Sequence, residues 1–206
     1  MNPATSGQID REAEAGPGRA MATLRHERHS GWTIALHWSS VVAVLIAAVA
    51  ALWHEAIEET ALRNLLMDVH RQAGLYVLVV LGMRLVVRFT VGMADVTKDM
   101  HFLLRWAAQG AHAALYVVLF ALPMLGWAGS SAHGVSLRLF GLLPLPSLVQ
   151  DDPDVADTLT DYHLWAAWAL LGLVLMHVAA AGWHHLGRRD GVLAAMAPWV
   201  RRHPPR

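Results

Sequence analysis

Four long stretches of this sequence contain few charged residues, and this pattern constrains the fold more than any other feature. Residues 33–53 contain no Asp, Glu, Lys or Arg, and the same is true of residues 106–137. A helix needs about 20 mainly apolar residues to cross the hydrocarbon core of a bilayer. Because a spanning segment must satisfy its backbone hydrogen bonds internally, the pattern predicts an all-α membrane protein, a bundle of four transmembrane helices.

The limits of the spans follow from the charges that flank them. In the second span, Arg84 and Arg88 lie four residues apart on one helical face and can extend to the nearer membrane surface. The third charge-free run is longer than one span requires, so we end its helix near Ala128, after a kink expected at Pro123. The four spans are expected at residues 33–53, 70–89, 106–128 and 162–187.

The basic residues lie mainly on one side of the predicted membrane. Of the 16 Lys and Arg residues, 13 fall in the N-terminal tail, the inner end of the second span with the connection that follows it, and the C-terminal tail. The other side holds Arg63, Arg71 and Arg138 together with nine carboxylates. Because cytoplasmic segments are enriched in Lys and Arg, we expect both termini in the cytoplasm. We call the carboxylate-rich side the outer side and the opposite side the inner side.

The remaining segments are expected outside the hydrocarbon core. Residues 1–29 lack hydrophobic periodicity and are predicted to form a disordered cytoplasmic tail. Residues 30–190 make up the four-helix domain, and residues 191–206 form a tail on the inner membrane surface. Residues 137–149 are apolar but short and contain two prolines, so we expect them at the outer interface. The first apolar run is interpreted as a retained helix, because the polar leader before it carries acids, unlike a signal peptide.

The composition restricts the chemistry that such a bundle can perform. The 206 residues include 13 His and no Cys, which excludes disulfides, thiolate metal sites, iron–sulfur clusters and covalently attached c-type haem. The four spans contain no Asp or Glu, which argues against a proton pump or a hard-cation transporter. Neutral imidazoles without counter-charges suit a soft metal or a haem iron. The histidines of the spans include His37, His70, His112, His163, His177 and His184.

Two of these histidines stand on one face of the fourth span at opposite depths. His163 and His177 are 14 residues apart, and this spacing corresponds to nearly four whole turns and an axial rise of about 21 Å. One helix therefore offers an outer and an inner ligand to the interior of the bundle, where four-helix bundles commonly build cofactor sites.

A partner for the outer ligand is found at matching depth. Asp68 and Asp161 each precede a histidine by two residues and can cap the start of a helix, which places His70 and His163 at equal depth near the outer surface. His54 is a rival but stands at the end of its span, so we expect it at the interface.

The inner ligand has two candidate partners. His37 and His112 both lie near the inner end of their spans, and depth alone does not choose which of them faces His177. We therefore predict two histidine pairs, one in each leaflet, with the inner partner left open.

Short motifs around these histidines follow one another along the chain in a fixed order. They are Ile34-Ala35-Leu36-His37-Trp38, Val69-His70-Arg71-Gln72-Ala73-Gly74, Met83-Arg84-Leu85 with Arg88, Ala111-His112 with Ala121-Leu122-Pro123, and Tyr162-His163 with His177 and Trp183-His184-His185. Together they resemble the bacterial cytochrome b561 family over residues 30–198, and within it the superoxide:ubiquinone oxidoreductases most closely.

This resemblance implies a multi-pass protein of the bacterial inner membrane that binds two haem b groups without covalent bonds. By position, His37 and His177 resemble the ligands of the cytoplasmic-side haem iron, and His70 and His163 those of the periplasmic-side haem iron. His112 resembles a family histidine that is not an axial ligand, and it either bonds a haem edge or propionate or packs between helices.

The resemblance also implies superoxide oxidation at the periplasmic side coupled to ubiquinone reduction, with the redox chemistry belonging to haem and quinone. His184 lies two turns beyond His177 on the same face and is the candidate quinone contact, with His185 second. Arg84 and Arg88 are candidate partners of haem propionates, with extension to the membrane surface as the alternative.

The electron donor depends on the charge around the outer pair. Superoxide is an anion, whereas the outer side carries nine carboxylates and three arginines. Arg71, next to His70, and Arg63 are candidates for a local positive entrance. Without such an entrance, a cationic protein such as a soluble cytochrome is the better donor.

Two other functions are consistent with parts of the pattern. A cytochrome b subunit would pass electrons between quinone and a dehydrogenase or a periplasmic redox protein. A histidine-based metal or proton transporter is disfavoured by the lack of carboxylates in the spans and of an evident inverted repeat. The expected partners are quinone, superoxide or a periplasmic redox protein, and membrane lipid, with no nucleic acid.

Overall fold

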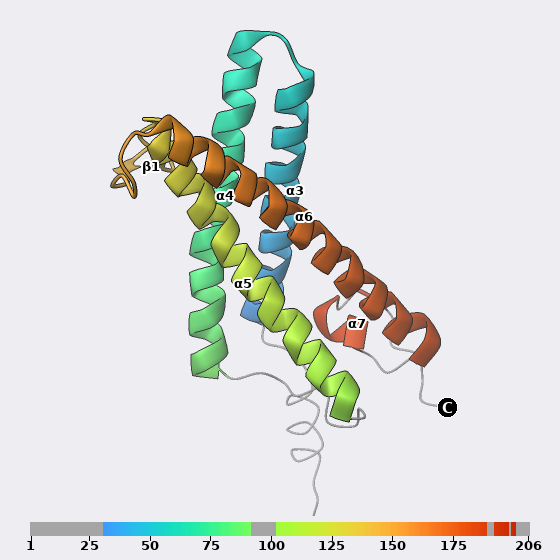
Figure 1. The fold of residues 1–206 in the computed structure, drawn as a ribbon. Coiled ribbons are helices and arrows are strands. Elements are labelled where there is room, and N and C mark those ends of the chain that lie inside the picture. The colour runs from blue at the N-terminus through green and yellow to red at the C-terminus, as the bar shows by residue number, and fades with distance from the viewer. Residues whose placement is uncertain (1–30, 92–101, 189–191, 198, 201–206) are drawn as a thin grey trace, which may run out of the picture.

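The fold consists mainly of four long helices (Figure 1). The computed structural model describes residues 31–91, 102–188, 192–197, 199 and 200; the predicted N-terminal tail and part of the C-terminal tail lie outside them. The helices are α3 (Gly31–Ala56), α4 (Thr60–Val91), α5 (Phe102–Ala132) and α6 (Pro153–Trp183). Each of the four is long and apolar enough to cross a membrane, so the predicted fold class, an all-α membrane protein with four spans, is confirmed.

The helices pair as two antiparallel hairpins. α3 packs extensively along α4, and α5 along α6, whereas the main contact between the hairpins is that of α4 with α5. Figure 1 shows α5 and α6 crossing the α3/α4 hairpin at an angle. The buried residues of α3 are the small residues Ser40, Ala43 and Ala50, which let the backbone of α4 approach closely. α3 and α6 have no extensive contact in the described part of the chain.

The helix limits correct two details of the sequence prediction. α5 continues through Pro123 to Ala132, past the predicted end at Ala128, because a missing N–H inside a helix is tolerated when neighbouring groups compensate. α6 begins at Pro153, and its cap is Asp152, whose side chain accepts from the backbone N–H of Asp154 at 3.0 Å. A proline in the first turn needs no backbone donor, so this start is favourable.

The predicted capping roles of Asp68 and Asp161 are therefore wrong. Asp68 lies within α4 and Asp161 within α6, because both helices begin further out than predicted, α4 at Thr60. The two aspartates stand on helical surface, where they are exposed. The helices thus project beyond the predicted spans at the outer end, where water and headgroups accommodate the charges.

The connection between α5 and α6 folds back onto α4. It contains two short antiparallel strands, β1 (Arg138–Leu139) and β2 (Leu143–Pro144). The side chain of Gln72 donates to the Arg138 carbonyl at 2.8 Å and accepts from the Phe140 backbone N–H at 2.9 Å. Phe140 has φ 53°, a left-handed conformation that non-glycine residues rarely adopt. The stretch predicted at the outer interface is thus attached to the α3/α4 hairpin.

The segment after α6 packs against the inner end of α3. α6 continues as a π-helical turn, η1 (His184–Arg188), and the short helix α7 (Val192–Met196) follows. The indole N–H of Trp38 donates to the Met196 carbonyl at 2.8 Å, and its ring lies 5.0 Å from that of Trp199. This part of the predicted surface tail therefore packs against the start of α3.

Candidate functional site

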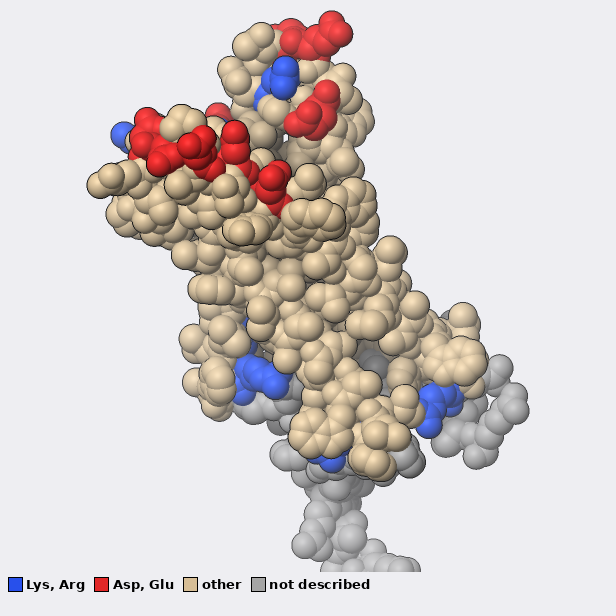
Figure 2. All heavy atoms as spheres, in the orientation of Figure 1, with Lys and Arg blue, Asp and Glu red and all other residues tan. Residues whose placement is uncertain are grey.

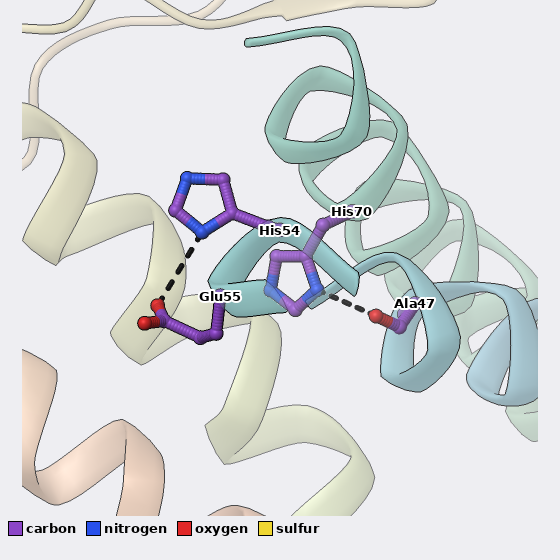
Figure 3. Close-up of polar contacts among 4 residues, drawn as sticks. All are labelled: Ala47, His54, Glu55 and His70. Atoms are coloured by element: carbon purple, nitrogen blue, oxygen red, sulfur yellow. Dashed lines mark hydrogen bonds and ion pairs between the residues drawn. The ribbon is translucent and has the colours of Figure 1, made fainter. Parts of the chain in front are cut away.

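The outer pair consists of His70 from α4 and His163 from α6. Their ring centroids are 5.9 Å apart, with an interplanar angle of 76°. Nδ1 of His70 bonds the Ala47 carbonyl at 2.9 Å (Figure 3), and Nδ1 of His163 bonds the Leu122 carbonyl at 3.0 Å. Because a carbonyl oxygen only accepts, each Nδ1 carries the proton and each Nε2 keeps a lone pair. Such a backbone contact fixes the tautomer and orientation of a histidine that binds metal through its other nitrogen.

The two outer imidazoles are oriented in equivalent ways. His70 stands on the second helix of the first hairpin and bonds a carbonyl of the first helix, α3. His163 stands on the second helix of the other hairpin and bonds a carbonyl of its first helix, α5. Each hairpin therefore supplies and orients one imidazole of the outer pair by itself.

The inner site brings together three histidines from three helices. The ring of His177 on α6 lies 6.4 Å from that of His37 on α3 and 5.4 Å from that of His112 on α5. Depth along the spans left both partners open, the family resemblance pointed to His37, and the structure places both beside His177.

The ring separations can be compared with the space that an iron requires. A metal–imidazole bond is about 2.0 Å, and a ring nitrogen lies about 1.2 Å from the ring centroid, so two imidazoles on opposite sides of one iron would have centroids about 6.4 Å apart. The separations in His37–His177, 6.4 Å, and His70–His163, 5.9 Å, are close to this distance, and the 5.4 Å of His112–His177 is shorter. The geometry thus fits an iron between His37 and His177 better than one between His112 and His177.

The donor sets also indicate the kind of metal centre. Among the described residues, no group of three or more His, Cys, Asp or Glu side chains is placed to hold a metal ion. Each pair of imidazoles could hold a haem iron, for which the porphyrin would supply the other nitrogen ligands. The site therefore fits haem iron and lacks the ligands of a protein-only zinc site.

Two arginines stand beside the inner histidines. The guanidinium carbons of Arg84 and Arg88 on α4 lie 5.3 and 5.7 Å from the ring centroid of Tyr116 on α5. Sequence reasoning singled out both arginines but missed Tyr116. Its position one turn after His112 was the available signal, since that spacing puts both side chains on the same face of α5.

The outer arginines do not provide a strongly positive entrance. Arg71 Nη1 lies 3.2 Å from Asp68 Oδ1 on the preceding turn, so its charge is paired. Arg63 is exposed, two turns further out on α4. His54 is paired with Glu55, with Nδ1 3.3 Å from Oε1, and takes no part in the outer pair (Figure 3).

The acidic side chains gather at the outer end. Figure 2 shows them where α6 begins and where α3 turns into α4, with basic side chains mainly at the opposite end. At that opposite end, the candidate quinone contacts His184 and His185 both lie in the π-helical turn η1. A π-helical turn at the end of a helix frequently marks a functional position.

A glycine adjoins the outer pair closely enough to be tested. A Cβ at Gly126 would lie 3.3 Å from Cε1 of His163, whereas a Cβ at Gly110 on the same helix would meet nothing within 4 Å. Gly110→Ala is expected to raise the free energy of unfolding by about 0.5–1 kcal/mol through helix propensity. Gly126→Ala is expected to lose this gain, because the His163 ring must move. Chemical unfolding in detergent measures both, and equal stabilisation of the two variants would contradict a contact role for Gly126.

The fold and the paired imidazoles define a membrane protein of the b-type cytochrome class. Residues 28–199 match the family model described as prokaryotic cytochrome b561, and the chain belongs to that family. The protein is therefore an integral membrane protein that binds haem b and transfers electrons.

Curated relatives cover nearly the same part of the chain. Cytochrome b561 homolog 2 of Escherichia coli (strain K12) is 28% identical over 171 residues, which are 82% of this chain and 91% of that protein. A probable superoxide oxidase CybB of Yersinia pestis is 27% identical over 176 residues, 85% of this chain and 99% of that protein. Cytochrome b561 homolog 1 of Escherichia coli (strain K12) is 28% identical over 174 residues, 83% and 97% of the two chains.

Proposed function

We propose that the protein carries electrons from a donor at the periplasmic side of the inner membrane to quinone near the cytoplasmic side, through two haem b groups. The observation that supports this most directly is the presence of two separate histidine pairs that share α6. Their α6 members, His163 and His177, are 14 residues apart, which is an axial rise of about 21 Å. The excess of Lys and Arg at the inner end supports cytoplasmic termini.

Each residue has a role in this scheme. His70 and His163 would hold the outer haem, and His37 and His177 the inner one. Bound haem would supply one-electron transfer. The carbonyls of Ala47 and Leu122 hold the outer imidazoles in the tautomer that binds metal.

The cytoplasmic end provides the remaining contacts. His184, with His185 beside it, is positioned in η1 to donate a hydrogen bond to a quinone oxygen and to deliver protons from the cytoplasmic surface. Arg84 and Arg88 are the candidate propionate partners, because a guanidinium binds carboxylates in a bidentate manner. His112, beside His177, is a candidate contact of the inner haem edge.

Superoxide is the proposed donor, supported by the relative described as a probable superoxide oxidase. Two superoxide anions each lose one electron and become dioxygen, while one quinone gains two electrons and two protons and becomes quinol. Purified protein mixed with ubiquinone and a superoxide source should show reduction of the haems and then of the quinone. Superoxide dismutase should abolish both, and haem reduction that persists with the dismutase would exclude superoxide as the electron source.

A cationic redox protein is the second candidate donor. It is favoured by the acidic outer end (Figure 2) and by the pairing of Arg71 with Asp68. Ionic strength separates the two donors, because salt screens exposed charges. Reduction by a basic cytochrome should slow as salt is raised, since attraction is weakened. Reduction by superoxide should become faster, since repulsion is weakened. A basic cytochrome that gives no haem reduction at low salt would exclude the second candidate.

A further inference from the structure

We propose that Arg84, held on Tyr116 together with Arg88, raises the reduction potential of the inner haem above that of the outer one. This inference rests on the proposed function, in which each histidine pair holds a haem. It assigns to Arg84 a tuning role that goes beyond binding a propionate.

Arg84 is placed at the depth of the inner pair. It follows His70 on α4 by 14 residues, the same spacing that separates His163 from His177 on α6. Because His70 and His163 face each other at the outer end, Arg84 and His177 reach similar depths at the inner end. The guanidinium carbon of Arg84 lies 5.3 Å from the ring centroid of Tyr116, one turn after His112 on α5, and the ring of His112 lies 5.4 Å from that of His177.

The charge of Arg84 is not balanced by a carboxylate of the described residues. The ion pairs of that part of the chain are His54–Glu55 and Arg71–Asp68, both at the outer end. Arg84 and Arg88 instead share the face of the Tyr116 ring, which attracts cations while leaving their net charge in place. A positive charge near the iron favours the state with one more electron, which is the ferrous iron.

The outer pair has the opposite surroundings. Asp68 and Asp161 precede His70 and His163 by two residues, and both aspartates are exposed. Both outer imidazoles donate Nδ1–H to a carbonyl, which makes them more basic ligands and favours ferric iron. The acidic residues lower the outer potential relative to the inner one, so electrons move downhill toward the inner side.

Redox titration of the purified holoprotein, followed by absorbance, tests this assignment. The wild type should titrate in two steps. Arg84→Gln should lower the higher-potential step by about 59 mV, which corresponds to a tenfold change in the equilibrium constant for one electron. Arg84→Lys keeps the charge and should retain most of the wild-type value. Arg138→Gln, which removes a cation at the outer end away from the inner pair, should leave the higher step unchanged.

Haem content, measured first, separates this inference from the proposed function. A wild type that binds fewer than two haems per chain would contradict the proposed function itself. With two haems present, an unchanged higher step in Arg84→Gln would overturn the inference, as would an equal shift in Arg84→Lys. If Arg84→Gln loses the inner haem, Arg88→Gln provides the test, because removal of this second cation should also lower the higher step, and an unchanged value would overturn the inference.

Discussion

Replacing His163 with alanine is expected to reduce the haem content from two to one per chain. The outer haem would keep a single axial ligand, His70, and the Leu122 carbonyl would lose its partner, so the cofactor is no longer held from both hairpins. His177→Ala should remove the inner haem in the same way. The measurement is the haem content of purified protein together with the reduced-minus-oxidised spectrum.

A histidine outside the pairs provides the matched control. His133 lies at the outer end of the chain after α5, with Nδ1 bonded to the carbonyl of Gly129 at 2.8 Å. His133→Ala should keep both haems. Retention of two haems by His163→Ala would remove His163 from the ligand set, and a loss of haem in His133→Ala equal to that in His163→Ala would show that the loss reports unfolding.

His177→Ala is also expected to separate the two halves of the reaction. The outer haem should still accept electrons from the donor, because its ligands His70 and His163 are intact. Quinone reduction should fall to the rate seen without protein, because in the proposed scheme electrons pass from the outer haem through the inner haem to a quinone at η1. Stopped-flow absorbance of the remaining haem and a quinol assay on the same sample measure the two halves.

The variant that lacks the outer ligand provides the converse test. His163→Ala should lose rapid reduction by the outer donor while quinol added at the inner side still reduces the remaining haem. If His177→Ala reduces quinone at the wild-type rate, quinone must take electrons at the outer pair, and the proposed position beside His184 would be wrong.

The number of spans was predictable from the sequence because the cost of placing charge in hydrocarbon leaves long charge-free runs. The structure also brings His70 beside His163, as their spacing suggested, although the aspartates invoked to place them do not cap their helices. The depth of the two histidines in the membrane was still predictable, because each stands at the start of an apolar run. The helices extend outward past those runs, where the local cap, Asp152, could not be recognised from the span alone.

Contacts between helices were less predictable than positions along them. The stacking of Arg84 and Arg88 on Tyr116 depends on how α4 and α5 rotate against each other, which a pattern on one helix does not define. The attachment of the β1/β2 connection likewise depends on contacts between distant parts of the chain. Gln72 bonds Arg138, 66 positions away, and Phe140, 68 positions away. Depth alone did not choose between His37 and His112 as the partner of His177, because both lie near the inner end of their spans, and the structure places both rings beside that of His177.

The division of the bundle into two hairpins bears on how the mature protein is assembled. Each hairpin can insert and orient its own outer imidazole before the other is present, because both carbonyl contacts are internal to a hairpin. Both histidine pairs join α6 to the α3/α4 hairpin, and α6 and α3 have no extensive contact of their own in the described residues. A haem held by either pair would therefore add a second link between the two hairpins, beside the contact of α4 with α5.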